Sequence, residues 1–281
     1  MLLSLILHTA HAALDELRFD AMLDWQNNPY SGSYQNAYIK VTQQLCAAMA
    51  NSALTPPKTY GFQGIGVDLQ QSFSFIDSSS ELKDPPSSWS LMTEDEAAQR
   101  HLWIPEIQLR KGLPFSMEVG SKIGYIGNSK LGTYGAWGRI TPLEGYKEGP
   151  DLSFQIGYSG LVGSDQFALG VMDIGMVIGK TFAFGPYVDL KSAHVTPMLT
   201  FGQLKTKSLL RIDNELQETM NIENYSSMPQ FISPKINQEN TSPNYIAAGV
   251  QILNNDFRFQ LNYRNTFGTL TTLSSSIGFL Y

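Results

Sequence analysis

The last nine residues of the chain alternate between apolar and small or polar side chains up to the terminal carboxylate. One face of this stretch consists of Leu273, Ser275, Ile277, Phe279 and Tyr281, and the other of Ser274, Ser276, Gly278 and Leu280. Successive side chains of a β-strand point to opposite faces, so the stretch predicts a strand with one apolar face. A soluble domain rarely ends on such a strand, because free termini fray and an unpaired edge invites aggregation.

This ending resembles the C-terminal strand of bacterial outer-membrane β-barrels, whose final aromatic residue is read by the barrel-assembly machinery. The resemblance implies that Ile277, Phe279 and Tyr281 form an assembly signal. It also implies that the protein resides in the bacterial outer membrane. Its partners would then be the lipids of that membrane and, during biogenesis, the barrel-assembly machinery.

The same period of two recurs between Tyr60 and the C-terminus. In residues 257–264 one face reads Phe257, Phe259, Leu261 and Tyr263, and the other reads Arg258, Gln260, Asn262 and Arg264. Several such runs reach the roughly 9–11 residues that a tilted strand needs to cross a bilayer, against about 5–6 in a typical soluble strand. No run of about 18 or more consecutive apolar residues occurs, so a membrane-spanning helix is not predicted.

The lengths of the connections predict the topology. Segments 77–99 and 208–243 are long, polar and rich in Ser, Asn and Pro, whereas most other links are short. The predicted strands cover 60–77, 100–110, 114–127, 131–141, 151–162, 167–182, 187–207, 244–253, 257–266 and 269–281. Bacterial barrels place short turns in the periplasm and long loops outside. An antiparallel up-and-down barrel of about ten strands, with its C-terminus in the periplasm, puts both long segments outside.

One predicted strand changes phase. Val188 and Leu190 lie on one face, but Val195, Leu199 and Phe201 lie on the other. A β-bulge near residues 192–194 would restore the alternation. Two shorter strands in this region are the alternative, and they would raise the total toward twelve.

The N-terminal part of the chain divides into two segments before the barrel of residues 59–281. Residues 1–12 contain a short apolar run followed by Ala10-His11-Ala12, a pattern typical of a cleaved signal peptide, although no Lys or Arg precedes it. The alternative is an apolar tail. Residues 13–58 are predicted to form a periplasmic segment with one short amphipathic helix between Ser33 and Leu54. This helix lies either on the periplasmic side or in the barrel mouth as a plug.

The strands place charged side chains of both signs on their inward faces. The predicted lumen residues are Asp68, Glu106, Arg110, Glu118, Lys122, Arg139, Asp173, Asp189, Lys191, Arg258 and Arg264. Small barrels fill their interior with side chains, and unpaired buried charges are costly, so ion pairs across the lumen are expected. The charges either rigidify the barrel or line a narrow path for a solute or ion.

Several local stretches resemble a family of bacterial outer-membrane β-barrel proteins of unassigned activity. They are Arg110–Phe115, Glu118–Gly120, Glu144-Gly145, Pro150-Asp151, Gly179-Lys180 with Phe182, and Pro186-Tyr187. The resemblance covers the chain from about Ala53 to the C-terminus. It implies the barrel fold and brings no catalytic residue.

The remaining patterns point to few chemical roles. The single cysteine, Cys46, forms no internal disulfide, and no metal or cofactor motif occurs. A formal charge of −6 without a basic cluster argues against nucleic acid. Asp189, Ser192 and His194 suggest a rim hydrolase, but the short motifs of such enzymes are missing, so no enzyme is predicted.

The two long loops are the predicted place of surface contacts. Loops on a rigid scaffold commonly carry recognition, and Trp89, Tyr225 and Phe231 are candidate anchors for a surface ligand. The predicted role is structural or surface-interactive, the alternative is a narrow channel, and a rim hydrolase is less favoured.

Overall fold

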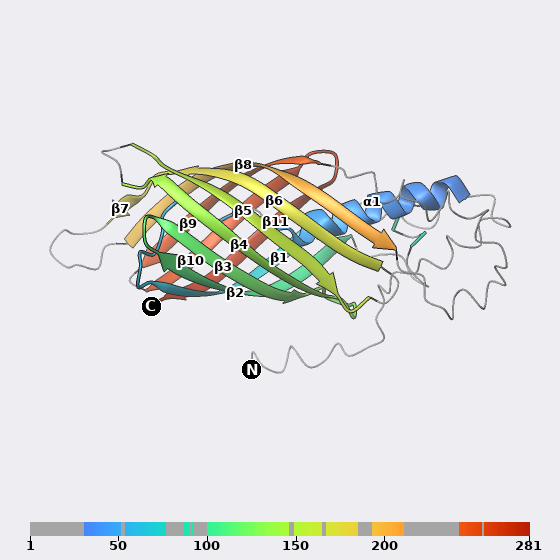
Figure 1. The fold of residues 1–281 in the computed structure, drawn as a ribbon, viewed down its shortest axis with the longest axis horizontal. Coiled ribbons are helices and arrows are strands. Elements are labelled where there is room, and N and C mark those ends of the chain that lie inside the picture. The colour runs from blue at the N-terminus through green and yellow to red at the C-terminus, as the bar shows by residue number, and fades with distance from the viewer. Residues whose placement is uncertain are drawn as a thin grey trace.

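Ten long strands close into an antiparallel barrel in the part of the chain that the computed structural model describes (Figure 1). The described residues are 31–51, 54–76, 87–89, 91–92, 100–145, 149–164, 167–184, 193–210, 242–254 and 256–281. The elements are α1 (Ser31–Met49), β1 (Ile65–Phe75), β2 (His101–Leu113), β3 (Met117–Tyr125), β4 (Gly132–Leu143), β5 (Asp151–Val162), β6 (Phe167–Gly179), β7 (Phe182–Phe184), β8 (Ala193–Leu210), β9 (Asn244–Asn254), β10 (Phe257–Thr266) and β11 (Leu270–Leu280).

Each long strand pairs with its neighbours in sequence, and two further pairings close the ring. Strand β1 pairs with β11, and β6 pairs directly with β8. The three residues of β7 pair with the beginning of β8 and stand outside the ring. The predicted up-and-down barrel of about ten strands is therefore confirmed, and the alternative of twelve does not hold for the described residues.

Strand β8 differs from its predicted bounds. It begins at Ala193, while residues 185–192 lie outside the described part of the chain. Its register with β9 runs from His194 to Gln203 without a break. The suggested bulge concerns the phase of residues 188–190, which lie outside the described part of the chain, so it stays a prediction. The register shifts between β4 and β5, at Ile140 and Leu143. Pro142 lies within this shift and, having no N–H, cannot extend the ladder.

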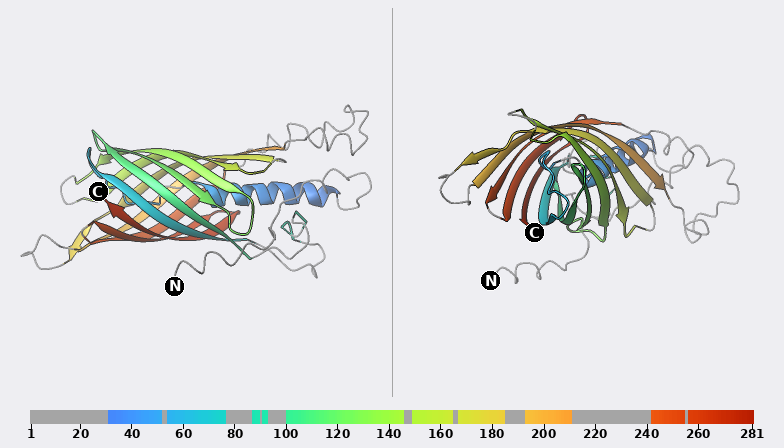
Figure 2. Two further views of the ribbon diagram at one scale, coloured as in Figure 1. Left: turned by 90° about the horizontal axis from the view of Figure 1, so that it is seen from below. Right: turned by 60° about the vertical axis from the view of Figure 1, so that its left-hand side comes forward.

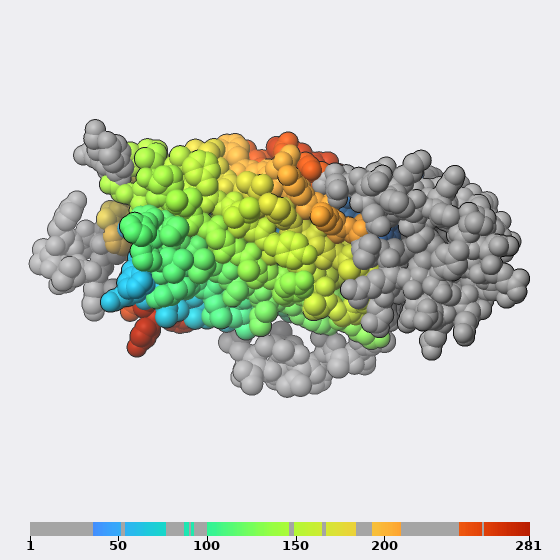
Figure 3. Space-filling view, in the orientation of Figure 1, coloured from blue at the N-terminus to red at the C-terminus, as the bar shows by residue number. Residues whose placement is uncertain are grey.

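The outer face of the barrel is an apolar belt. Side chains such as Leu69, Ile123, Ile156, Leu261 and Ile277 are exposed there, while the alternate residues of the same strands are buried. The wall shown in Figure 3 is continuous over the strands. Within the described residues, no helix is both long and apolar enough to span a membrane.

A closed ring satisfies every strand edge without water, which a lipid environment requires. The strands between Ile65 and Leu280 that cross the barrel have 9 to 18 residues, long enough to span a bilayer when tilted. The closed antiparallel ring, the apolar outer belt and the polar interior together characterise a bacterial outer-membrane β-barrel. The protein is accordingly placed in the bacterial outer membrane.

The two ends of the barrel are different. At one end, here called the C-terminal end, the backbone of Tyr281 pairs with that of Ile65, where β1 begins. The opposite end, here called the loop end, carries the links from β1 to β2 and from β8 to β9, which contain most of segments 77–99 and 208–243. Most of those two segments lies outside the described residues.

The C-terminal part of helix α1 lies inside the barrel at the loop end and the rest extends beyond the strands, as Figures 1 and 2 show from three directions. The apolar side chains of Tyr38, Val41, Leu45 and Met49, spaced three or four residues apart, are fully buried there. The predicted helix is thus confirmed with bounds shifted to Ser31–Met49. Of its two predicted positions, the periplasmic side and the barrel mouth, the structure supports the second. The helix is a plug, and it enters from the loop end.

Candidate functional site

The described residues 36–51 and 54–60 are here called the lumen segment, and from Ala37 onward they occupy the interior of the barrel and its mouth. At the loop end, Gln44 Nε2 donates to the carbonyl of Thr269, in the link between β10 and β11, at 3.0 Å. At the C-terminal end, the backbone N–H of Thr59 donates to Glu144 Oε1, just after β4, at 2.8 Å. The lumen segment therefore runs the length of the barrel.

The helical part of the lumen segment packs into an apolar cluster at the loop end. Members of this cluster from the barrel include Leu131, Leu161, Phe167, Leu169, Leu204, Tyr245 and Leu270, and Trp89 and Met92 join it from the β1–β2 link. The indole N–H of Trp89 donates to Gln44 Oε1. Trp89 is 2% exposed, so it covers the helix and is not the exposed loop anchor that the sequence suggested.

Two barrel cations hold the C-terminal end of α1. Lys122 Nζ donates to the carbonyl of Met49 at 2.9 Å, and Arg264 donates to the carbonyl of Ala47. The last turn of α1 contains no basic residue of its own. Its free carbonyls and the negative end of its dipole are thus satisfied by side chains from β3 and β10.

Asn51 fits into a gap left by two inward-facing glycines. Its Nδ2 donates to the backbone carbonyls of Ala136 on β4 and Tyr158 on β5, at 3.0 and 2.8 Å. A Cβ atom at Gly135 would lie 2.7 Å from Asn51 Oδ1, and one at Gly157 would lie 3.0 Å from Asn51 Nδ2. Larger residues at these two strand positions would displace the lumen segment.

From Leu54 to Tyr60 the lumen segment has no helix or strand, and side chains of the barrel bind its backbone carbonyls. Arg139 Nη1 donates to the carbonyl of Pro56 at 2.7 Å, and Gln260 donates to the carbonyl of Leu54. Arg139 is fixed in turn by Gln155 Oε1, at 2.6 Å. Each of these buried donors thus satisfies a peptide group that has left regular secondary structure.

Tyr60 ends the lumen segment between two arginines. The centre of the Arg110 guanidinium lies 4.5 Å from the centre of the Tyr60 ring, and that of Arg258 lies 5.1 Å from it. Arg110 Nη1 also donates to the Tyr60 hydroxyl at 2.8 Å. These cation–π contacts and the hydrogen bond close the C-terminal end of the lumen around one aromatic side chain.

The predicted lumen charges form a nearly balanced network. Nine of them are described and all are buried; they comprise four carboxylates, Asp68, Glu106, Glu118 and Asp173, and five cations, Arg110, Lys122, Arg139, Arg258 and Arg264. Three ion pairs connect Arg110 to Glu118, Lys122 to Glu106 and Arg258 to Asp68. The charge of Asp173 is offset through space by Lys122 and Arg264. Asp189 and Lys191 lie outside the described residues.

The other residues singled out in the sequence lie elsewhere. Ile277 and Phe279 are exposed on the outer face of β11, and Tyr281, which follows the strand, is exposed as well. His194 is half-buried at the beginning of β8. Asp189, Ser192, Tyr225 and Phe231 lie outside the described residues, so the suggested hydrolase group and two of the three loop anchors stay predictions.

The residues that fix the lumen segment were not found from the sequence, apart from the charged ones. Gln44, Asn51 and Tyr60 contact strands or links far away in the chain, and no local pattern identifies those partners. Glycines at inward strand positions, such as Gly135 and Gly157, were the available signal, because a missing side chain on an inward face leaves room for another group.

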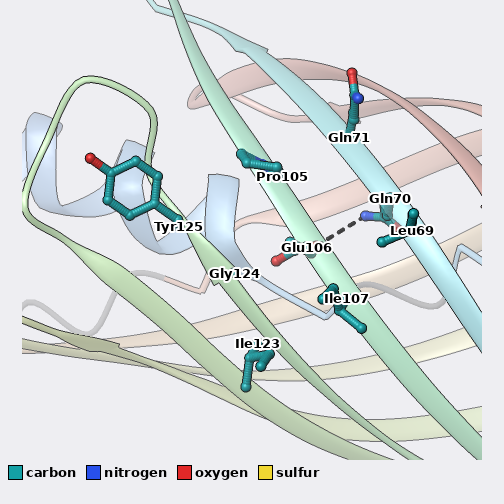
Figure 4. Close-up of a pocket in the computed structure, with 9 residues that line it drawn as sticks. All are labelled: Leu69, Gln70, Gln71, Pro105, Glu106, Ile107, Ile123, Gly124 and Tyr125. Carbon is teal, nitrogen blue, oxygen red and sulfur yellow. Dashed lines mark hydrogen bonds between the residues drawn. The ribbon is translucent and has the colours of Figure 1, made fainter. Parts of the chain in front are cut away.

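A groove of about 390 Å³ lies in the outer wall over β1, β2 and β3 (Figure 4). Among its lining residues are Leu69, Gln71, Pro105 and Ile123. The ladder between β2 and β3 begins only at Glu106, because Pro105 has no N–H to donate. Gln70 Nε2 donates to Glu106 Oε2 at 3.1 Å and forms part of the floor.

The chain matches no family model and no curated protein sequence. Among solved structures it is similar to a KdgM porin, with 6% identity and a TM-score of 0.30 over 76% of this chain and 98% of the porin. It is also similar to LpxR from Salmonella typhimurium, with 9% identity and a TM-score of 0.36 over 77% and 99% of the two chains. The Acinetobacter baumannii outer-membrane protein Omp33 has 9% identity and a TM-score of 0.26 over 78% of this chain and 100% of its own. Likeness at this level says nothing of function.

Proposed function

We propose that the protein is a closed outer-membrane scaffold that presents its loop end to the surroundings, in a structural or surface-interaction role. The observation that carries this proposal is the lumen segment, which is tied to the barrel wall from Gln44 at one end to Tyr60 at the other. The competing role of a narrow channel requires a continuous water path through the same space.

Opening such a path would leave several buried charges without partners. Lys122, Arg139 and Arg264 each donate to a carbonyl of the lumen segment. A hydrogen bond to a charged group contributes about 1.5–3 kcal/mol, and these three cations are all buried. Withdrawal of the lumen segment would break all three hydrogen bonds together, which favours a permanently occupied lumen over a gated pore.

The surface role rests on the asymmetry of the two ends. Short turns of outer-membrane barrels face the periplasm and long loops face outward, which assigns the C-terminal end to the periplasm. Segments 77–99 and 208–243 then lie outside, on a rigid barrel, where binding loops are commonly found. Trp89 and its contact with Gln44 attach the first of these segments to the plug. Tyr225 and Phe231 remain the candidate contact residues.

Planar-bilayer recordings test the closed state. The purified full-length protein should give no conductance steps above background. A variant lacking residues 36–58, checked for barrel folding by heat-modifiable migration on gels, should conduct and so show that the assay detects an open barrel of this size. Steady conductance steps from the full-length protein would contradict the closed scaffold and support the role of a channel.

A further inference from the structure

We propose that the chain preceding α1 leaves the barrel at the loop end, so that the protein exposes its own N-terminal region on the outer surface of the cell. The barrel would thus hold a segment threaded through its lumen, with the N-terminal side outside and β1 beginning at the periplasmic end. The direction of threading rests on contacts within the barrel, and only the side of the membrane on which the loop end lies rests on the proposed function.

The order of contacts gives the direction of the chain. From the N-terminal side, Gln44 contacts the β10–β11 link at the loop end, and Met49 contacts Lys122 within the barrel. Pro56 then contacts Arg139, and Thr59 contacts Glu144 at the C-terminal end. The chain therefore runs from the loop end to the C-terminal end without turning back.

The N-terminal part of the helix emerges from the barrel at the loop end. Ala37 and Tyr38 are 1% and 0% exposed, whereas Asn36 is exposed. Figures 1 and 2 show the first turns of α1 extending beyond the strands, at the end opposite the C-terminus. Residues before Asn36 thus begin outside the loop end.

The polarity of the helix is selected by charge. The carbonyls of Ala47 and Met49 point toward Arg264 and Lys122, which are buried inside the barrel. A helix inserted in the opposite direction would present N–H groups and the positive end of its dipole to the same two cations. Only the orientation with the N-terminus toward the loop end satisfies both.

A return of the preceding chain through the barrel is excluded by space. An α-helix with its side chains is about 10–12 Å across, and the side chains around α1 form a packed cluster that includes Leu45, Leu204 and Tyr245. At the other end, Tyr60 is enclosed by Arg110 and Arg258. The described part of the barrel therefore has no space for a second pass of the chain.

Cysteine labelling of intact cells tests this topology. Cys46 is the single cysteine of the chain and is buried, so Cys46→Ala provides the background. Three separate variants then carry Asn36→Cys beside α1, Lys130→Cys at the loop end, or Asp256→Cys at the C-terminal end. All three native side chains are exposed, and each variant is checked for heat-modifiable migration.

A membrane-impermeant maleimide should label Asn36→Cys and Lys130→Cys on intact cells, and Asp256→Cys only after the outer membrane is permeabilised. The threading would be overturned if Asn36→Cys and Asp256→Cys were labelled under the same condition, intact or permeabilised, and Lys130→Cys were labelled only under the other. If Asp256→Cys alone were labelled on intact cells, the threading would stand and the sidedness in the proposed function would fail. An epitope inserted between residues 30 and 31, detected by antibody on intact cells, gives a second readout that needs no cysteine.

Discussion

Lys122 on β3 and Glu106 on β2 form an ion pair of 2.7 Å in which each side chain is 2% exposed. The same ammonium group donates to the carbonyl of Met49, the last residue of α1. One cation thus joins the wall of the barrel to the plug inside it. The stability of the barrel and the position of the plug are coupled at this point.

Replacement of Lys122 should destabilise the barrel strongly. Lys122→Met leaves the Glu106 carboxylate buried without its cation, and loss of one partner of a buried pair costs about 3–5 kcal/mol. Urea unfolding of the protein in lipid vesicles measures this loss. The double variant Lys122→Met with Glu106→Gln should recover much of it, because no unpaired charge then remains. An equal loss in the single and double variants would contradict the role assigned to the ion pair.

Gly157→Ala should disturb the lumen segment, whereas Gly138→Ala should not. A Cβ at Gly157 would lie 2.6 Å from Asp173 Oδ2 and 3.0 Å from Asn51 Nδ2, but one at Gly138 meets nothing within 4 Å. Overpacking of this kind costs about 1–3 kcal/mol, and it should appear as a lower urea midpoint. Because both positions are strand glycines on β5 and β4, equal effects would mean that the gap around Asn51 is not required.

Leu261→Arg tests the outer belt. Leu261 is exposed at the middle of β10, where an arginine facing lipid costs about 2–4 kcal/mol. Ile65→Arg is the control, because Ile65 is equally outward-facing but begins β1 at the rim, where the cost falls to about 0–1 kcal/mol. Folding yields and urea midpoints in vesicles should differ accordingly. Similar costs at the two depths would argue against a membrane around these strands.

The C-terminal aromatic should matter for assembly more than for stability. Tyr281 is 99% exposed, so Tyr281→Ser should leave the urea midpoint of the refolded protein unchanged. In cells the same variant should lower the amount of folded barrel in the outer membrane, if the machinery reads this side chain. Phe75→Ser, an exposed aromatic at the other end of β1, is the control. A drop in the midpoint of Tyr281→Ser would assign the residue a structural role instead.

The strands could be predicted from the sequence because their period of two is local. The alternation through Phe257, Leu261 and Tyr263 fixes one strand and the facing of its residues without any knowledge of its neighbours. The position of α1 could not be predicted in this way. Its apolar side chains fit any apolar surroundings, and its place in the lumen depends on Lys122 and Arg264, which are distant in the chain.

The same limit explains Trp89 and Asn51. A tryptophan in a long polar segment looks like a surface contact until its partner Gln44 is known. Asn51 looks like an ordinary polar residue after a helix, and only the pairing of β4 with β5 brings Gly135 and Gly157 beside it. Predictions from a single sequence fail where the position of a side chain is set by partners that are distant in the chain.

The lumen segment and the closing strands meet in the chain as well as in space. Tyr60 ends the segment, Ile65 begins β1, and the backbone of Ile65 exchanges hydrogen bonds of 2.8 and 2.7 Å with that of Tyr281. The first and last strands are therefore joined right beside the exit of the threaded segment. Separation of β1 from β11 would therefore open the ring and free the end of the lumen segment at the same place.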